Sequence, residues 1–385
     1  MLETVRASRA VPPVESVALE AAAGRVLAKP VAADRDYPAL ARSVRDGYAV
    51  RTLDLPGELE VIGEVRAGES FGGEVGAHQA VEIMTGAPVP RGADAVVMLE
   101  YVRREGVGVI VDQTAKAGQF INPQACEAHA GEILLHPGQR LDYTGVALLA
   151  AAGQERAPVY AAPRVAIIAT GDEIVPVAAK PRDFQIRNSN VYSLAAQVVR
   201  AGGSPGILPV ARDEIAHTRE LIERGLGADL LLLSGGVSAG KYDIVERVLG
   251  DMGAEFFFDR VLIQPGQPLV FGKARGKFFF GLPGNPSSTM VTFEIFARAA
   301  LELLGGQEDV QLHMPLARLT EDFHHRAGLT RFLPARLSAD GAAVTPIAWR
   351  GSSDVPAMTR ANAFMVVDAD RPAWKAGDWI RVLFK

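Results

Sequence analysis

The stretch DLLLLSGGVSAGKYD, residues 229–243, contains four consecutive leucines that lead directly into a glycine-rich loop. An apolar run of this kind, bounded by a turn signal, predicts a buried β-strand over residues 229–233. Strands and helices with one apolar face alternate around it, which predicts a doubly wound α/β domain. The other strands are expected at residues 164–169, 207–211, 256–263, 269–271 and 278–281. Four helices are expected: one at residues 191–201, one whose start is capped by Asp213, one that ends at Met252, and one at residues 289–304.

Five polar loops rich in glycine, proline or acidic residues follow the predicted strands. In a parallel sheet the carboxyl ends of the strands share one edge, and ligands bind outside that edge. Glycines there let backbone N–H groups approach an anion closely. Each loop alone could be an ordinary turn, whereas five on one edge predict a binding site. They are residues 170–173 (TGDE), 212–213, 234–243, 264–268 (QPGQP) and 282–288 (LPGNPSS).

Composition limits the class of protein. The chain has 385 residues, 48% of them hydrophobic, and a net charge of −5, which is typical of a globular protein with several domains. Lys and Arg form no stripe, which argues against nucleic-acid binding. The apolar runs are shorter than the roughly 20 residues that cross a bilayer, and the N-terminal segment lacks the apolar core of a secretory signal. Because Cys126 is the single cysteine, a disulfide framework is excluded, and we expect a cytoplasmic protein.

The patterns outside the α/β part predict smaller domains. Residues 1–29 predict a helix, residues 35–50 a loop with a turn at Asp46-Gly47, and residues 143–152 a second helix. Between them, short strands without helical periodicity predict an inserted β domain, and strands after residue 310 predict a β-barrel-like C-terminal domain. The inserted strands are expected at residues 58–65, 79–84, 95–102 and 107–111. The expected division is an N-terminal helical and linker domain, 1–50 with 128–160, the inserted domain, 51–127, the α/β domain, 161–307, and the C-terminal domain, 308–385.

Seven motifs are spread over nearly the whole chain: SVRDGYAV (43–50), MTGAPVPRGADAVV (84–97), TGDE (170–173), SGGVSAGKYD (234–243), GLPGNPSS (281–288), LTRFLPAR (329–336) and GSSDVPAMTRANAF (351–364). Together, and in this order, they resemble the molybdopterin molybdenumtransferase family, MoeA, to which the E domain of gephyrin belongs. The resemblance implies a MogA-like molybdopterin-binding fold for the α/β domain. It also implies that the protein inserts molybdate into adenylated molybdopterin, with release of AMP, in molybdenum cofactor biosynthesis.

The resemblance further implies which residues act. The implied catalytic residues are Asp46, Thr85, Glu173, Asp213 and Asp243, of which Glu173 and Asp243 would also hold Mg²⁺. The implied molybdopterin-binding residues are Gly235, Gly236, Ser238, Gly240, Pro283, Gly284 and Asn285. The implied molybdate-binding residues are Gln264, Gln267, Ser288, Arg331 and Ser352. Carboxylates beside an anionic substrate suit either a hard divalent cation or the paired N–H groups of a pterin, and the sequence leaves both roles open.

Some of these residues also have ordinary structural roles open to them. Asp213 would cap a helix in any case, Thr85 could be a turn hydroxyl, and Arg331 could be a charge on a strand surface. Ser353 is as good a hydrogen-bond donor as Ser352. These alternatives are distinguished only by where the fold places each side chain.

The chain departs from the family pattern in the QPGQP loop and at residue 127. Gln264 and Gln267 stand where lysines are usual, and Glu127 stands where an aspartate is usual. The two glutamines keep open a non-catalytic molybdopterin-binding or scaffold homologue. The middle domain also resembles nicotinamide-nucleotide amidases, which keeps open a hydrolase of another nucleotide.

The resemblance also implies partners. Asp46 and Thr85 of one subunit would reach the pocket of the other, so that a two-fold homodimer carries two equivalent sites. The molybdopterin adenylyltransferase is a candidate second partner.

Overall fold

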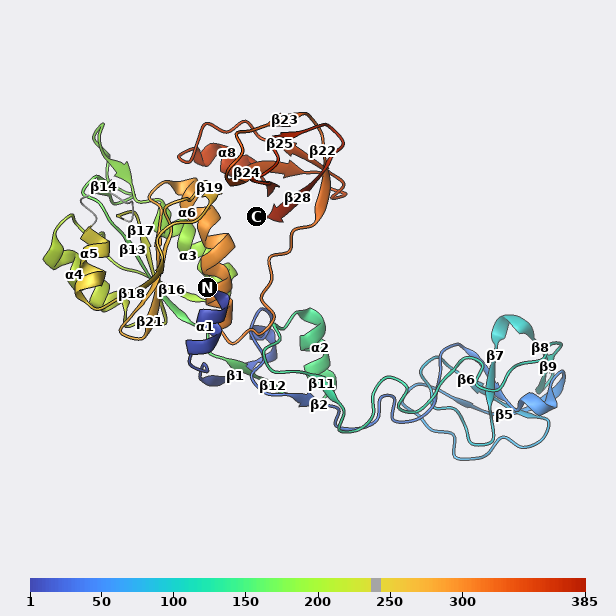
Figure 1. The fold of residues 1–385 in the computed structure, drawn as a ribbon. Helices are drawn as coiled ribbons and strands as arrows, with labels where there is room; N and C mark the ends of the chain where they lie inside the picture. Colours follow the sequence, from blue (N-terminus) through green and yellow to red (C-terminus); the bar gives the residue numbers. More distant parts are fainter. Residues whose placement is uncertain (237–243) are drawn as a thin grey trace. The chain divides into compact units, whose positions relative to one another are not determined.

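The larger of the two compact units that make up the chain contains a six-stranded sheet with helices packed on it (Figure 1). The computed structural model describes residues 1–236 and 244–385. The larger unit contains Met1–Ala28, Gly138–Asp142 and Pro158–Lys385, and the smaller unit contains Lys29–Pro137 and Tyr143–Ala157. The order across the central sheet is β16 (Ser204–Ile207), β13 (Arg164–Ala169), β17 (Leu230–Ser234), β21 (Lys277–Leu282), β20 (Val270–Ala274) and β18 (Glu255–Phe258), of which the first four are parallel.

Apolar side chains cover both faces of this sheet. Val165 and Ile167 of β13 pack in one core with helices α3 (Asn190–Arg200) and α7 (Arg298–Leu304). Ala166 and Ile168 pack in a second core with α4 (Ile215–Gly225) and α5 (Ile244–Asp251). Successive side chains of a strand point to opposite faces, so one continuous apolar run supports both helical layers. The predicted doubly wound α/β domain is confirmed.

The chain reverses its direction of travel across the sheet beside β13. From β13 it passes through α3 to the edge strand β16, and then through α4 to β17 on the other side of β13. The loops that leave the carboxyl ends of β13 and β17 therefore diverge. Crevices at such switch points are the usual ligand sites of open α/β sheets.

The C-terminal part forms a closed barrel, which confirms the predicted β-barrel-like domain. Five strands pair in a ring that closes through β24 and β26, and the short strand β19 (Ile263–Gln264) joins β24 from outside the ring. This pairing links the QPGQP loop to the barrel. The ring order is β24 (Thr330–Leu337), β25 (Ala343–Pro346), β22 (Leu316–Leu319), β28 (Trp379–Phe384) and β26 (Ala363–Val367).

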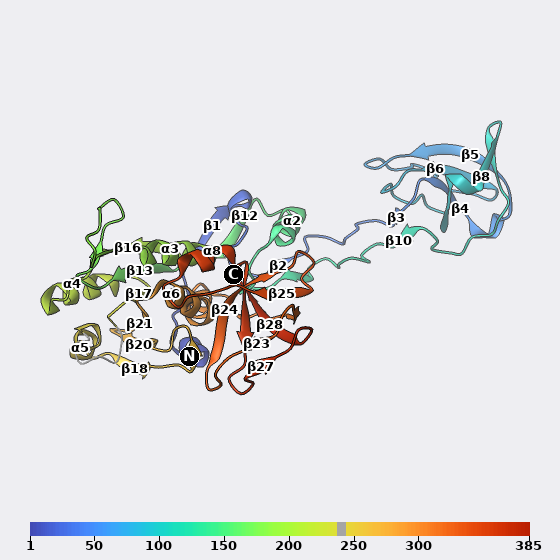
Figure 2. The same cartoon turned by 90° about the horizontal axis from the view of Figure 1, so that it is seen from above.

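A second six-stranded sheet dominates the smaller unit and confirms the inserted β domain. A two-stranded ribbon of β3 (Arg42–Ser43) and β10 (Ile121–Asn122) leads into it (Figure 2). Helix α2 (Tyr143–Ala151) forms where the sequence predicts it. The order of the sheet is β7 (Ala95–Met98), β4 (Gly47–Val50), β6 (Gln79–Ile83), β5 (Gly57–Val65), β9 (Gly108–Val111) and β8 (Val102–Glu105).

The predicted helix over residues 1–29 is wrong. Helix α1 (Leu2–Ser8) is short and ends before Pro12-Pro13, where proline removes the backbone donors that a helix needs. The next residues form the strand β1 (Val14–Ala18), which pairs with β12 (Arg156–Tyr160) far along the chain. A partner so distant in sequence leaves little local signal for the strand.

Three other predictions are corrected. The strand expected at residues 207–211 is β16, which begins and ends earlier, at Ser204–Ile207. Its side chains are mostly exposed at the edge of the sheet, so the apolar run that suggested residues 207–211 does not mark the strand. Asp213 does not cap α4, whose N-cap residue is Glu214 and makes no side-chain capping bond. The expected loop over residues 35–50 contains β3 and the central strand β4.

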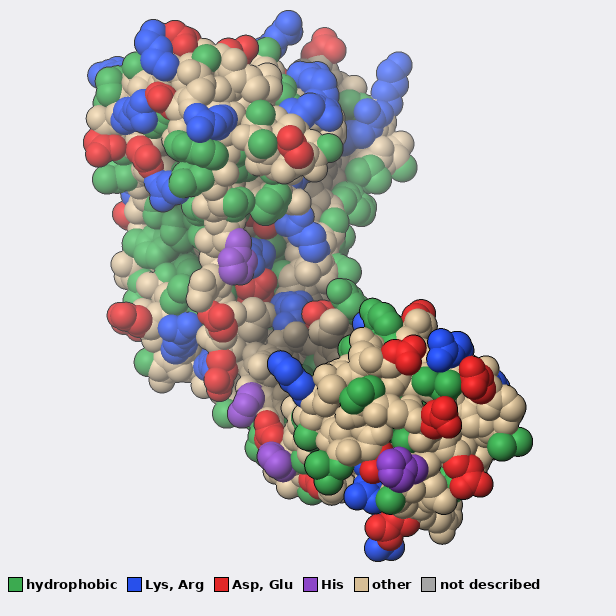
Figure 3. Space-filling model, turned by 90° about the vertical axis from the view of Figure 1, so that its right-hand side faces the viewer, with side chains coloured by type: hydrophobic (Ala, Val, Ile, Leu, Met, Phe, Trp, Pro, Cys, Tyr) green, Lys and Arg blue, Asp and Glu red, His purple; other side chains and the backbone are tan. Residues whose placement is uncertain are grey.

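Charged side chains of both signs are mixed over the face drawn in Figure 3. Cys126 is an exposed free thiol. Across the described residues, 1–236 and 244–385, we find no helix that combines the length and the apolar character of a membrane span.

Candidate active site

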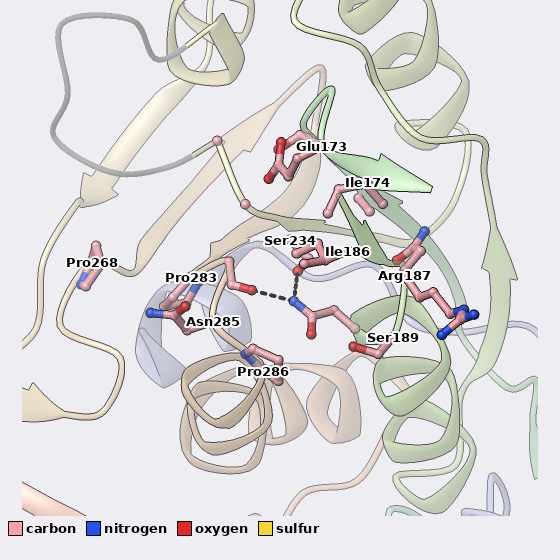
Figure 4. Close-up of a pocket in the computed structure, with 17 residues that line it drawn as sticks. Glu173, Ile174, Ile186, Arg187, Ser189, Ser234, Pro268, Pro283, Asn285 and Pro286 are labelled. Atoms are coloured by element: carbon pink, nitrogen blue, oxygen red, sulfur yellow. Dashed lines mark hydrogen bonds between the residues drawn. The ribbon is translucent and has the colours of Figure 1, made fainter. Parts of the chain in front are cut away.

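A cavity of about 400 Å³ opens at the switch point of the larger unit's sheet (Figure 4). Its walls come from the loops after β13, β17 and β21 and from the start of α3. Several lining residues were not selected from the sequence, among them Thr170, Arg187, Asn188 and Asn190. Of the predicted site residues that the structure describes, six line it: Glu173, Gly235, Gly236, Pro283, Gly284 and Asn285.

The two glycines after β17 are required by their backbone. Gly235 has φ +90° and Gly236 has φ +63°, a left-handed conformation that other residues adopt only at a cost. A Cβ atom at Gly236 would lie 2.7 Å from Oγ1 of Thr170, and a Cβ atom at Gly235 would lie 3.0 Å from the carbonyl oxygen of Thr170. The loop can therefore run against Thr170 only without side chains, and this leaves its backbone open to the cavity.

The loop after β21 connects the cavity to the C-terminal barrel. The side-chain amide of Asn285 donates to Oγ of Ser352 over 2.8 Å, and the backbone N–H of Ser287 donates to the carbonyl oxygen of Ser352 over 2.9 Å. These contacts place Ser352, rather than Ser353, next to a lining residue. Ser288 lies one residue further into helix α6 (Pro286–Thr292) and is buried.

Glu173 presents an exposed carboxylate to the cavity. Among the described residues, no Lys or Arg forms an ion pair with it. Asp213 lies at the same edge of the sheet, where its backbone N–H lies 3.4 Å from Oδ1 of Asp172, but it does not line the cavity. The remaining predicted residues of this region, Ser238, Gly240 and Asp243, lie outside the described residues.

The predicted molybdate-binding residues are partly brought together. Gln264 of β19 is the register partner of Arg331 of β24, so the two side chains belong to adjacent strands. Nε of Arg331 is buried and has no hydrogen-bond partner within the described part of the chain. The backbone of Gln267 accepts a hydrogen bond from Val261 over 3.0 Å, and the next residue, Pro268, lines the cavity. The QPGQP loop thus runs from the barrel to the cavity wall.

Asn190 and Thr170 have roles that depend on tertiary contacts. From the sequence, Asn190 indicates only the start of a helix, and Thr170 only the first residue of a TGDE turn. In the structure the Asn190 amide donates to Oγ of Ser234 and to the carbonyl oxygen of Gly284, over 2.9 and 2.7 Å. Arg187 is a cation of the cavity wall, and its Nε donates to the carbonyl oxygen of Ala179. No local sequence pattern identifies these contacts.

In the smaller unit, Asp46 and Thr85 form a pair. The backbone N–H and the hydroxyl of Thr85 both donate to Oδ1 of Asp46, over 2.6 and 2.8 Å. These two hydrogen bonds stabilise the carboxylate and lower the pKa of Asp46 below its ordinary value of 3.8. Two residues 39 positions apart, both predicted to be catalytic, are therefore held together on an exposed surface.

We expect Thr85→Val to raise the pKa of Asp46 toward its ordinary value, because valine keeps the shape and removes the hydroxyl donor. The change should be partial, since the backbone donor remains. Because the pKa of Asp46 is lower in the folded state than in the unfolded state, its ionised carboxylate stabilises the fold at any pH above the unfolded-state pKa. This contribution is lost as the pH falls through the folded-state pKa. The measurement is an NMR titration of the carboxylate. Asp36 is the control, because Ala130 and Gln124 lower its pKa and it should not respond.

Comparison with known proteins identifies the family of the chain. Residues 1–153 match the family described as MoeA N-terminal region (domain I and II), residues 166–303 a probable molybdopterin binding domain, and residues 316–385 the MoeA C-terminal region (domain IV). The chain is 32% identical over 381 residues to a molybdopterin molybdenumtransferase of Staphylococcus aureus strain Mu50, covering 96% of this chain and 91% of that protein. The chain belongs to the molybdopterin molybdenumtransferase family.

Other members give the same result. The molybdopterin molybdenumtransferase of Staphylococcus epidermidis strain RP62A is 32% identical over 378 residues, covering 96% of this chain and 90% of that protein. The crystal structure of the molybdopterin biosynthesis moeA protein from Pyrococcus horikoshii OT3 matches with a TM-score of 0.83 and 27% identity, covering 100% of this chain and 98% of that one. The family and the fold class implied by the motifs are confirmed.

Proposed function

We propose that this protein is a molybdopterin molybdenumtransferase, which inserts molybdate into adenylated molybdopterin and releases AMP in molybdenum cofactor biosynthesis. The observation that carries the proposal is the cavity at the switch point, which is lined by Glu173 and by the glycine-rich loops of a sequence that belongs to this family. A pocket of this volume suits a small molecule with a ring system and phosphates.

The protein groups in this cavity are suited to binding and orientation. The loop at Gly235 and Gly236 presents backbone without side chains, which suits close approach to a phosphate. Positioning two ligands against each other can supply a large part of the rate enhancement. We propose the same for the barrel side, where Gln264, Arg331 and Ser352 would bind molybdate as donors.

The Glu173 carboxylate fits a divalent cation such as Mg²⁺. Hard cations take oxygen ligands, and this carboxylate lies at the cavity without an ion pair to a Lys or Arg of the described residues. When bound, the cation would supply Lewis-acid charge beside the phosphoanhydride. Glu173 would hold it together with Asp243, which lies outside the described residues.

AMP release by the purified protein tests the function. The protein is incubated with adenylated molybdopterin and Mg²⁺, with and without molybdate, and AMP is quantified. Release that depends on molybdate is expected. Binding without release would instead support the scaffold homologue, and release that is indifferent to molybdate would support a nucleotide hydrolase.

The glutamines of the QPGQP loop lead to a further expected result. We expect Gln267→Lys to tighten molybdate binding by about 1 kcal/mol, or roughly five-fold, because a charged donor binds an anion more strongly than a neutral amide. Gln264→Lys should gain less, since its register partner is the cation Arg331. Calorimetric titration with molybdate measures both. Unchanged binding in Gln267→Lys would show that this loop does not face the anion.

We propose that the active form is a homodimer in which Asp46 and Thr85 of one subunit complete the site of the other. Sedimentation velocity at micromolar concentration should give a dimer. Mixing inactive Asp46→Asn with inactive Glu173→Gln should restore about a quarter of the wild-type activity, because about half of the dimers are mixed and each of these has one intact site. An active monomer, or no restoration after subunit exchange, would contradict the shared site.

The remaining sequence expectations also stay proposals. We keep the four-part division at 1–50 with 128–160, 51–127, 161–307 and 308–385, together with a cytoplasmic location and a transient contact with the molybdopterin adenylyltransferase. Usage of one cysteine supports the location. Direct transfer of an adenylated substrate between two enzymes would give the contact a purpose.

A further inference from the structure

The amide of Asn190 joins two loops of the cavity. Its Nδ2 donates to Oγ of Ser234 over 2.9 Å and to the carbonyl oxygen of Gly284 over 2.7 Å (Figure 4, dashed lines). The same nitrogen also lies 3.3 Å from Oγ1 of Thr289. A carbonyl oxygen can only accept, so the contact with Gly284 determines which way the amide faces. Asn190 therefore ties the end of β17 to the loop after β21 from a third element, α3.

This arrangement also limits the role of the Ser234 hydroxyl. Ser234 is 3% exposed and lines the cavity. Because its oxygen accepts from Asn190, its hydrogen is left to donate elsewhere. Within residues 1–236 and 244–385, no acceptor takes that hydrogen. The hydroxyl is thus available as a donor at the cavity floor.

Unlike Ser234 Oγ, two other polar atoms at the cavity have no hydrogen-bond partner at all in the described part of the chain. Oγ1 of Thr170 and Oδ1 of Asn190 are buried without a hydrogen-bond partner there. Thr170 is 7% exposed, and both residues line the cavity. Buried polar groups are nearly always paired, so orphaned ones at a cavity indicate a ligand that completes them.

We infer that Asn190 is a positioning residue, which sets the spacing of the two ligand loops and directs the Ser234 hydroxyl toward an acceptor atom of the bound ligand. This inference rests on the proposed function for the identity of the ligand. It deepens that function by naming the polar floor that receives the ligand, namely Thr170, Asn190 and Ser234. The joining of the loops is a property of the ligand-free protein and can be tested separately.

Gln197 provides a matched control on the same helix. Its side-chain amide also ties α3 to the next layer, donating to the carbonyl oxygen of Met290 over 3.0 Å and to Oε1 of Glu294 over 2.6 Å. Gln197 does not line the cavity. A purely structural role of an α3 amide should therefore give Asn190→Ala and Gln197→Ala similar losses of stability and no difference in ligand binding.

The first measurement is hydrogen exchange on the ligand-free protein. In Asn190→Ala, residues 234–236 and 282–286 should exchange faster than in wild type, whereas in Gln197→Ala they should exchange at the wild-type rate. Asn190→Asp serves as a second variant if the alanine variant does not fold, because it keeps the shape and replaces the donor by an acceptor. Unchanged exchange of both loops in the folded variant would overturn the joining role.

The second measurement is calorimetric binding of adenylated molybdopterin. We expect about ten-fold weaker binding for Asn190→Ala and less than about two-fold for Gln197→Ala. If Asn190 acts through Ser234, the double variant Asn190→Ala with Ser234→Ala should lose much less than the product of the two single effects.

The two measurements separate the inference from the proposed function. Wild-type affinity in Asn190→Ala, or losses that simply multiply in the double variant, would overturn the positioning role. If wild type does not bind adenylated molybdopterin while exchange responds as expected, the proposed function fails and the joining of the loops stands.

Discussion

Glu173→Gln is expected to lower the rate of molybdate-dependent AMP release by about 100-fold while leaving the fold intact. Glutamine keeps the size of the side chain and one acceptor oxygen but removes the negative charge. That charge is needed whether the carboxylate holds a divalent cation or accepts the paired N–H groups of a pterin. The side chain is exposed and has no ion pair to a described Lys or Arg, so its charge contributes little to stability.

The neighbouring carboxylate is a matched control. Asp172 is also exposed, lies one residue earlier in the same TGDE turn, and does not line the cavity. It lies 4.0 Å from Arg212, an exposed pair that is worth little. Asp172→Asn should keep the rate within about two-fold of wild type. Equal losses in the two variants would indicate a general effect of charge at this edge and would remove Glu173 from the proposed machinery.

The fold could be predicted from the sequence where a central strand packs against helices on both faces of the sheet. The run RVAIIA of β13 is buried on both faces, so its composition alone indicates a central strand. The edge strand β16, with the sequence SPGI, has mostly exposed side chains and carries no such pattern. Strand β1 depends on pairing with β12, which no local window contains. Prediction thus succeeded where burial determines the residue types and failed where a distant partner does.

The site residues also fall into those that the sequence could predict and those that it could not. Gly235 and Gly236 were predictable because their backbone conformation excludes side chains, and this leaves a motif in the sequence. Asn190 was not predictable, since a single asparagine before a helix gains its role only from Ser234 and Gly284. Asp213 shows the converse, because its position in a loop at the correct edge did not bring it to the cavity.

Gly47→Ala is expected to destabilise the smaller unit by about 3 kcal/mol. Gly47 begins the central strand β4, where it pairs with Ile83 of β6 and Met98 of β7. A Cβ atom there would lie 2.0 Å from the carbonyl oxygen of Val97, 2.8 Å from its carbonyl carbon and 3.0 Å from Cα of Met98. All three atoms are backbone, so no side chain can rotate away, and β4 must separate from β7.

The same displacement should reach the preceding residue. Asp46 accepts two hydrogen bonds from Thr85, and moving the start of β4 should break them. The pKa of Asp46 should then rise toward its ordinary value. Gly72→Ala is the control in the same sheet domain, because a Cβ atom at Gly72 has no neighbour within 4 Å. Hydrogen exchange in urea over residues 47–50 and 95–98 measures the stability of the smaller unit by itself, since a two-unit chain need not unfold in one step. Gly72→Ala should stay within about 0.5 kcal/mol of wild type, and an equally small effect of Gly47→Ala would show that β4 and β7 can separate without cost.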